Sequence, residues 1–392
     1  MKIISARKGV FRSKVYLLLG LIFFLSVMVN AAGCGRIEQF TRSSSTGTDS
    51  LQYADFTDQM VEERTGQVVI EVPPAYELMQ IALSLTQASQ QQPYRYTHPE
   101  TAYYRQVMDH FGPFRDHELI KTLDDTIRNP TSYRAIFDHQ ITPDGLVPSS
   151  VYQVDHLSGA FQTSLDLLKE FAVETEFEDF YTAHQPYYQD QIQRYQEIVP
   201  VRGIWEFLEV NFSTEIDSVR IVLSPLMVGT NNTIKFVDRE QDFYESLLFV
   251  PSPNVIQDHP SIPAEAADQV LTRSMFTEID HNYVNPATDQ YLEEIDRAMR
   301  RLSDWHTGSG YTSPAEKFNE YFTWAVFFPW AKQYYSPQDY QDIYQITMER
   351  MQYRGFIRFE AFTQELLRQV DLHPEKTLEE HMPVMIQWMK AQ

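Results

Sequence analysis

The chain is poor in cysteine and in basic residues, and each shortage excludes classes of protein. Cys34 is the only cysteine among 392 residues, which excludes an internal disulfide framework and any metal site built from several cysteines. Lysine and arginine number 32 against 54 aspartate and glutamate residues, so the net charge is −22. Because a phosphate backbone repels such a surface, we expect no nucleic-acid partner.

Glycine-rich phosphate-binding motifs are also missing. Neither G-x-x-x-x-G-K-[ST] nor G-x-G-x-x-G occurs in the chain, so we expect no nucleotide ligand. Hydrophobic residues make up 43% of the sequence and aromatic residues 14%. This composition excludes a disordered tail, a collagen-like fibre and a multi-pass membrane protein, and it supplies a large core.

The N-terminal segment has the features of an export signal. Residues 1–14 carry five basic residues and no acid, and residues 15–29 form an uninterrupted apolar run. This order is typical of a signal peptide, and the run is shorter than the roughly 20 residues of a spanning helix. Residues 31–34 read Ala-Ala-Gly-Cys, which resembles the bacterial lipobox. The resemblance implies cleavage after residue 33 and lipidation, with palmitate among the acyl groups, at Cys34. The alternative is an ordinary secretory signal with a chance cysteine nearby.

The expected location is the bacterial cell envelope. Removing residues 1–33 removes five cations and no anion, so acyl chains at Cys34, rather than charge, must hold the protein on its membrane. Gly35 does not resemble the inner-membrane retention signal, which favours the outer membrane, on its periplasmic or its surface face. Residues 34–60 are rich in serine, threonine, glycine and aspartate, and we interpret them as a flexible tether.

We expect a single domain over residues 61–392, because neither a repeat nor a shift in composition divides this stretch. Strands are predicted at 68–72, 218–223, 233–237 and 247–250 from their short apolar runs and flanking turn residues. Helical periodicity fills most of the rest. After residue 263 it predicts helices at about 264–284, 290–304, 314–328, 337–353, 358–370 and 375–389. The pattern is α+β and helix-dominated, with one small central sheet.

The helix predicted at 264–284 carries the main chemical signal. Its apolar stripe continues into Glu278 and His281, one turn apart. The segment Thr277-Glu278-Ile279-Asp280-His281 resembles the zincin motif H-E-x-x-H, in which two histidines hold zinc and the glutamate polarises a water molecule. Thr277 stands at the position of the first histidine.

A second helix supplies a possible partner for this motif. The stretch 314–328 is apolar nearly all round, which indicates burial on most sides, and it contains Asn319-Glu320. In gluzincin-type metallopeptidases the third zinc ligand is a glutamate on a downstream helix, and Glu320, 39 residues after His281, fits that role. The alternative is that Glu320 compensates the helix dipole.

Several segments together resemble a family of bacterial exported lipoproteins with gluzincin-like metallopeptidase features. They are VPPAYEL at 72–78, IVLSPL at 221–226, EIDHNYVNP at 278–286 and NEY at 319–321. The resemblance implies a metallopeptidase-like fold in which the strand before the motif helix forms the edge of a substrate cleft. It implies no particular substrate.

Thr277 leaves three interpretations open. Zinc is held by His281, Glu320 and a substitute such as His306, Asp280 or Thr277, with Glu278 as the base. Alternatively Glu278 becomes a ligand, and no obvious base remains. In the third interpretation, Glu278, His281 and Glu320 form a metal-free buried cluster.

The function expected from these interpretations is metal-assisted peptide hydrolysis, or ligand or partner binding by a catalytically inactive relative. A peptide or glycan groove lined by tyrosines is compatible with the second function. Such pairs of tyrosines also occur on half-buried helix faces. The tyrosines in question are Tyr94, Tyr96, Tyr103, Tyr104, Tyr187 and Tyr188.

Overall fold

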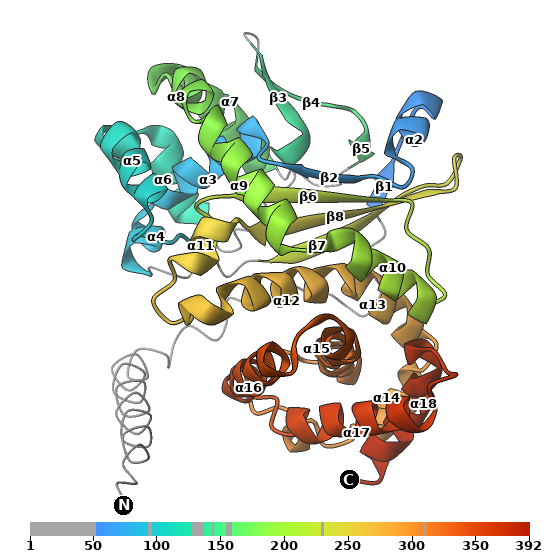
Figure 1. The fold of residues 1–392 in the computed structure, drawn as a ribbon. Coiled ribbons are helices and arrows are strands. Elements are labelled where there is room, and N and C mark those ends of the chain that lie inside the picture. Colours follow the sequence, from blue (N-terminus) through green and yellow to red (C-terminus); the bar gives the residue numbers. More distant parts are fainter. Residues whose placement is uncertain are drawn as a thin grey trace, which may run out of the picture. The chain divides into compact units, whose positions relative to one another are not determined.

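A mixed six-stranded sheet runs through the centre of the fold (Figure 1). The computed structural model describes residues 52–92, 96–126, 136–142, 145–153, 159–228, 231–308 and 310–392, all within one compact unit, Ser45–Gln392. The signal segment and Cys34 lie outside the described residues. The strand order is β2 (Val68–Glu71), β6 (Ser218–Ser224), β8 (Phe243–Pro251), β7 (Asn232–Asp238), β1 (Gln52–Ala54) and β5 (Tyr152–Gln153).

The inner strands are those that the sequence predicts. β6 and β8 are parallel, and β7 joins β8 in antiparallel register. Their apolar and β-branched residues suit strands covered on both faces, and nearly every residue of β8 is buried. The predicted strands at 218–223, 233–237 and 247–250 are therefore confirmed, as is the helix-dominated α+β class.

Four short strands are additional to those predicted. β1 and β5 extend the sheet beyond β7, and β3 (His139–Thr142) pairs with β4 (Gly145–Pro148) in a separate hairpin. Regular structure therefore begins at Gln52, within the stretch interpreted as the tether. β1 and β5 have only three and two residues, too few to show a period, and their pairing partners are distant in sequence.

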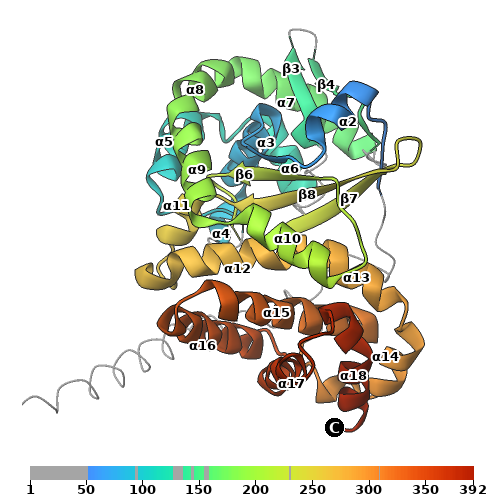
Figure 2. The same ribbon diagram turned by 45° about the vertical axis from the view of Figure 1, so that its right-hand side comes forward.

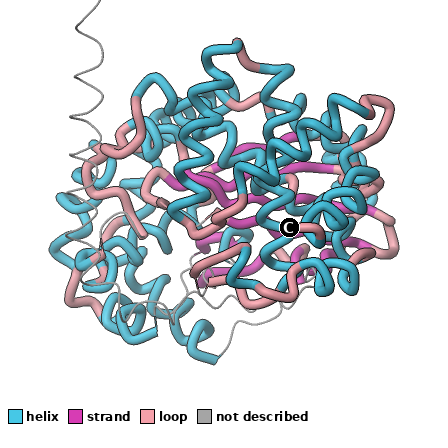
Figure 3. Tube along the Cα trace, turned by 90° about the horizontal axis from the view of Figure 1, so that it is seen from below, coloured by secondary structure: helices cyan, strands magenta, loops and turns pink. Residues whose placement is uncertain are grey.

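Helices cover both faces of the sheet (Figures 1 and 2). On one face, Tyr76 of α3 packs against Phe249 of β8, with ring centres 5.3 Å apart. On the other face, the Asn282 side-chain amide of α13 donates to the Thr233 and Ser246 hydroxyls of β7 and β8. Seen from this second side, helices cross in front of the strands (Figure 3).

The helices that precede α10 come from the N-terminal half of the chain. Their bounds are α2 (Asp58–Arg64), α3 (Pro74–Leu85), α4 (Gln87–Gln91), α5 (Ala102–Phe111), α6 (Glu118–Thr126), α7 (Gly159–Glu174), α8 (Phe177–Ala183) and α9 (Gln185–Ile198). Those that follow are α10 (Val201–Asn211), α11 (Pro253–Gln257), α12 (Ala267–Ile279), α13 (His281–Asp289), α14 (Leu292–Ala298), α15 (Pro314–Tyr334), α16 (Pro337–Tyr353), α17 (Phe359–Leu372) and α18 (Leu378–Lys390). None of the helices in the described residues is long and apolar enough to cross a membrane.

The helix α15 is the core of the C-terminal helical layer. Buried residues occur on all of its sides, as its continuous apolar sequence predicts. It packs against α12, α13, α14, α16 and α17. A capping box formed by Ser313 and Glu316 fixes its first turn. Glu316, rather than Glu320, is therefore the acidic residue of this helix start.

The predicted helix 264–284 is divided at Asp280. α12 ends at Ile279 and α13 begins at His281, while Asp280 keeps right-handed helical backbone angles. The chain stays nearly helical there because the Val284 N–H still donates to the Asp280 carbonyl, at 2.8 Å. Glu278 and His281 therefore remain one turn apart on adjoining helices.

Candidate functional site

The structure brings His281 and Glu320 together, as their positions on two core helices predict. His281 Nε2 lies 3.8 Å from Glu320 Oε1. His281 Nδ1 faces Asn285 Oδ1 at 3.3 Å and Thr323 Oγ1 at 3.5 Å, which orients the ring so that Nε2 points to the carboxylate. The two side chains are 19% and 13% exposed, so a small ligand can approach them.

Arg354 already compensates the charge of Glu320. Its Nη2 lies 2.6 Å from Glu320 Oε2, and Tyr311 also contacts this guanidinium group. Burial raises the pKa of Glu320, but the charges of Arg354 and His281 and the hydrogen bonds from Arg354 and Tyr311 outweigh it. The net result is a lowered pKa, so Glu320 is a carboxylate that is paired with a cation of the chain itself.

Asp280 is the most unusual acid near this pair. It is fully buried, and neither carboxyl oxygen has a hydrogen-bond partner in the described part of the chain. Burial, followed by the charges of Glu278 and Glu320, raises the pKa of Asp280 well above its usual range. The surroundings of Asp280 therefore favour its protonated form over the carboxylate.

The remaining candidate ligands are engaged elsewhere. The Thr277 hydroxyl donates to the Ser274 carbonyl of its own helix, at 3.2 Å. His306 Nδ1 lies 3.1 Å from the nitrogen and 2.9 Å from the carbonyl oxygen of Gly308, and its Nε2 lies 2.9 Å from the Arg354 carbonyl oxygen. Burial lowers the pKa of His306 despite the hydrogen bonds to Gly308 and Arg354, so both nitrogens of a neutral ring serve the local backbone.

Glu278, the expected base, is half-buried at the end of α12. Its charge contributes to the raised pKa of Asp280 and, after burial, to that of Tyr195. Glu278 therefore belongs to the same acidic neighbourhood as Asp280 and Glu320.

The sequence resemblance to gluzincins implies three zinc ligands, of which the chain offers two of a suitable type. His281 and Glu320 stand where an imidazole and a carboxylate ligand are expected, but the third position holds the hydroxyl of Thr277. Structural and catalytic zinc sites use at least three protein ligands, drawn from cysteine, histidine and carboxylate. Among the residues with described positions, no three such side chains are grouped closely enough to hold a metal ion. The residues present therefore do not complete a gluzincin zinc site.

A cleft lies on the face of the sheet opposite to the His281–Glu320 pair, and the sequence does not reveal it. It has a volume of about 880 Å³ and lies between the edge strand β2, the β3 strand and the helices α8 and α9. This volume falls within the range of ligand-binding clefts. No motif marks the cleft because its walls come from four separate parts of the chain.

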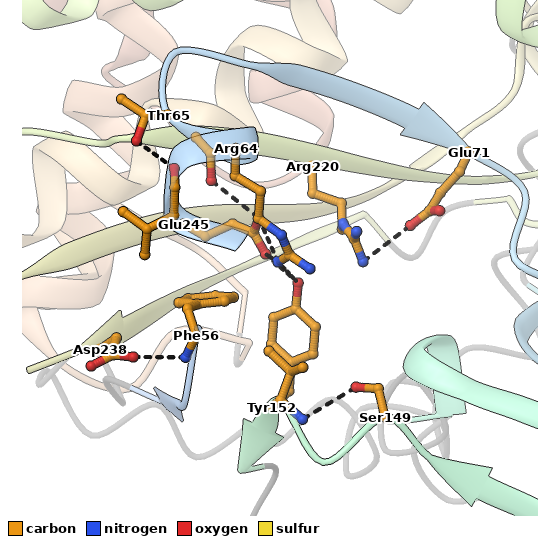
Figure 4. Close-up of polar contacts among 12 residues, drawn as sticks. Phe56, Arg64, Thr65, Glu71, Ser149, Tyr152, Arg220, Asp238 and Glu245 are labelled. Atoms are coloured by element: carbon orange, nitrogen blue, oxygen red, sulfur yellow. Dashed lines mark hydrogen bonds and ion pairs between the residues drawn. The ribbon is translucent and has the colours of Figure 1, made fainter. Parts of the chain in front are cut away.

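Charged and hydroxyl groups form the floor of this cleft (Figure 4). Arg64 Nη1 lies 3.2 Å from Glu245 Oε2 and donates to the Tyr152 hydroxyl at 2.7 Å. Tyr152 and Ser218 also donate to Glu245. The Glu245 carboxylate is therefore saturated by three neighbours and is a structural centre.

Arg220, from β6, is less completely paired. Its Nη1 lies 3.4 Å from Glu71 Oε1 on β2, and its buried Nε has no partner in the described part of the chain. Figure 4 shows this pair beside the Arg64–Glu245–Tyr152 cluster. Burial raises the pKa of Glu71, with the charge of Arg220 acting against this shift.

Aromatic side chains form one wall of the cleft. The Tyr181 hydroxyl donates to the Val72 carbonyl at 2.6 Å. Tyr188 also lines the cleft, and its hydroxyl lies 2.7 Å from that of Tyr103, which donates to Glu77 Oε1 at 2.8 Å. The wall is therefore fixed by hydrogen bonds to the sheet and to the core.

The tyrosines that the sequence suggested for a groove lie in different environments. Tyr188 lines the cleft, and Tyr103 is buried behind it with Tyr187 stacked on its ring. Tyr104 is buried and Tyr96 is half-buried, as expected of helix faces and core edges. Tyr94 lies outside the described residues.

The α+β domain belongs to a family defined by sequence alone. Residues 146–386 match the family described as a domain of unknown function, DUF4932, and the chain is a member of it. The matched region contains α12, α13 and α15, and also β6 and β8 of the cleft floor, but not β2. No curated protein and no solved structure matches the chain.

Proposed function

We propose that the chain is a lipid-anchored envelope protein whose metallopeptidase-like domain binds a peptide in the cleft beside β2, without hydrolysing it. The observation that carries this proposal is the cleft of about 880 Å³, with its hydrogen-bonded aromatic wall and its polar floor. Ligand sites combine such concave apolar walls with a few placed polar groups.

The motif region supports a non-catalytic role. Thr277 stands in place of a zinc-binding imidazole and bonds within its own helix. Arg354 occupies one oxygen of Glu320, so this carboxylate is already neutralised without a metal ion. The pairing of Glu320 with Arg354 and with His281 favours the third interpretation of the sequence, in which Glu278, His281 and Glu320 form a metal-free buried cluster.

The edge strand β2 favours a peptide over other ligands. The Val219 N–H donates to the Gln67 carbonyl, so Val69 and Glu71 direct their backbone groups to β6, and Ile70 directs its own outward. No described residue bonds to the outward N–H and C=O of Ile70, which lines the cleft. An extended peptide added beside β2 would satisfy these groups, as in other complexes that extend a sheet edge.

Calorimetric titration of the full chain in detergent with the peptide acetyl-Thr-Val-Thr-Val-Thr-amide tests the proposal. We expect saturable binding of this peptide. The same peptide N-methylated at alternate residues lacks the N–H donors along one edge, and we expect it to bind at least tenfold more weakly. Ile70→Pro removes the outward N–H of β2 while the N–H groups of Val69 and Glu71, which face β6, remain, so it should weaken binding to a similar extent. Equal affinity for both peptides, or no saturation with either, would overturn the proposal.

A second candidate function is metal-assisted peptide hydrolysis, with zinc on His281 and Glu320 and with Glu278 as the base. The 3.8 Å approach of His281 to Glu320 favours it. Metal analysis of the purified chain separates the two candidates, since about one zinc per chain, with hydrolysis lost in Glu278→Gln, supports the enzyme. Without bound zinc, and with no cleavage of casein above that of Glu278→Gln, the binding function stands.

A further inference from the structure

Arg273 and Arg350 lie near Arg354, the partner of Glu320, in a part of the fold that the peptide cleft does not use. Arg273 comes from the middle of α12, Arg350 from the last turn of α16, and Arg354 caps the end of α16. The helices α12, α15 and α16 pack against one another there. Glu320 supplies one carboxylate to this group, by its ion pair with Arg354.

Two of the guanidinium groups lie over the same aromatic ring. The Cζ atoms of Arg273 and Arg354 are 5.0 Å and 4.7 Å from the centre of the Trp324 ring. The two groups are therefore no farther apart than the sum of these distances. Like charges at this separation repel appreciably in a partly buried environment.

Among the described residues, Arg273 has no anionic partner of its own. Its Nη1 donates to the Thr347 hydroxyl at 3.0 Å, and its Nε is buried without a hydrogen-bond partner among the residues whose positions are described. Only 6% of the residue is exposed. Burial and the charges of Arg350 and Arg354 lower the pKa of Arg273 to about 9, which reflects how poorly this cation is compensated.

Two ordinary roles for arginine do not account for the whole cluster. Cations at a helix C-terminus interact favourably with the dipole, which explains Arg350 and Arg354 on α16. Arg273 lies in the middle of its helix, so the helix dipole does not stabilise its charge. The Trp324 ring stabilises cations through its π-face, but by only about 0.5–2 kcal/mol, and the chain is acidic overall, so a local excess of arginine is not a matter of composition.

We propose that Arg273, Arg350 and Arg354 bind an oxyanionic group, a carboxylate or a phosphate, beside the His281–Glu320 pair. Guanidinium groups present paired donors that match both oxyanions. Arg350 is exposed and gives the anion access, while Arg273 supplies the unsatisfied Nε donor at the buried end. The bound anion would balance the two positive charges that Glu320 leaves uncompensated.

The test uses the full chain with two anions, inorganic phosphate and acetate, each titrated against chloride at constant ionic strength. We expect the thermal midpoint to rise and saturate with at least one of them, because a ligand that binds only the folded state stabilises it by mass action. A rise of the midpoint with phosphate alone, or with acetate alone, identifies the oxyanion that the site prefers. A midpoint that is the same in all three salts overturns the proposal.

Substitutions locate the effect. Arg350→Gln changes an exposed side chain, so it should fold normally while its apparent dissociation constant for the anion rises at least tenfold. Arg300→Gln changes an exposed arginine that follows α14, so it is the matched control and should bind as the native chain does. Arg273→Met should be more stable than the native chain in chloride and insensitive to the anion, since it removes the uncompensated charge. Equal anion binding by native chain and Arg350→Gln would contradict the assigned site.

Discussion

At the scale of single residues, the ion pair of Glu320 and Arg354 determines the chemistry of the motif region. Arg354→Gln leaves the Glu320 carboxylate without its cationic partner and with Tyr311 and His281 beside it, and breaking such a buried pair costs about 3–5 kcal/mol. Urea denaturation should show this loss. Arg297→Gln, which breaks an exposed pair with Glu293, is the control and should cost less than about 1 kcal/mol. A loss as small in Arg354→Gln as in the control would show that the pair is solvated.

Glu77 provides a prediction about pH. This fully buried acid accepts a hydrogen bond from Tyr103, and burial raises its pKa to about 7, with the hydrogen bonds from Ser224 and Tyr103 acting against the shift. The folded state therefore holds the proton more tightly than the unfolded state, whose pKa is near 4.5. This contribution to stability is complete below pH 4.5 and is lost as the pH rises to about 7.

The corresponding variant is Glu77→Gln, which keeps an acceptor for Tyr103 and cannot ionise. Between pH 4 and pH 7 the native chain should lose about 3 kcal/mol of unfolding free energy relative to the variant. Denaturation curves at several pH values measure the difference. If the two proteins keep a constant difference over this range, Glu77 does not titrate as described.

At the scale of elements, Asn282 joins the motif helix to the sheet. Its amide donates to Thr233 and Ser246 on two strands, so Asn282→Ala leaves two hydroxyls without their donor. We expect a loss of about 1–3 kcal/mol in urea denaturation. Asn285→Ala, one turn later and closer to solvent, should cost less, and equal losses would mean that the contact with the sheet does not matter.

The sequence predicts some elements well and others not at all. β6, β7 and β8 carry apolar, β-branched runs between turn residues, and α15 is apolar on every side, so local pattern and tertiary position agree. β1 and β5 are too short to show a period. The division of the helix at Asp280 is equally invisible, since the backbone stays almost helical there.

The His281–Glu320 pair and the cleft also differ in how far the sequence predicts them. The sequence places His281 and Glu320 on helix faces that meet, because both lie in strongly periodic core helices. Arg354 follows Glu320 by 34 residues and belongs to no motif. The cleft requires β2 to lie beside β3 and α8, an arrangement that only the tertiary fold reveals.

At the scale of the whole molecule, Cys34 is expected to attach the domain to the envelope. Cys34→Ser should release the protein from the membrane fraction, because the acidic domain has no electrostatic affinity for anionic lipid. Fractionation of cells, with the unchanged chain as reference, measures this. If Cys34→Ser still sediments with the membrane, the lipobox assignment is wrong.

The two faces of the sheet separate the motif helices from the cleft. The motif helices lie on one face and the cleft on the other, so a substitution at His281 should leave the cleft intact. We therefore expect Glu278→Gln and His281→Gln to bind the pentapeptide with the affinity of the native chain.

The backbone N–H of Ile70 gives the most direct test of peptide binding in the cleft. In NMR hydrogen exchange, this amide should exchange readily in the free chain, because it points away from β6 at the edge of the sheet. Saturating acetyl-Thr-Val-Thr-Val-Thr-amide should slow its exchange at least tenfold and leave the already bonded Val69 amide unchanged. An Ile70 amide that exchanges equally fast with and without the peptide would contradict the account.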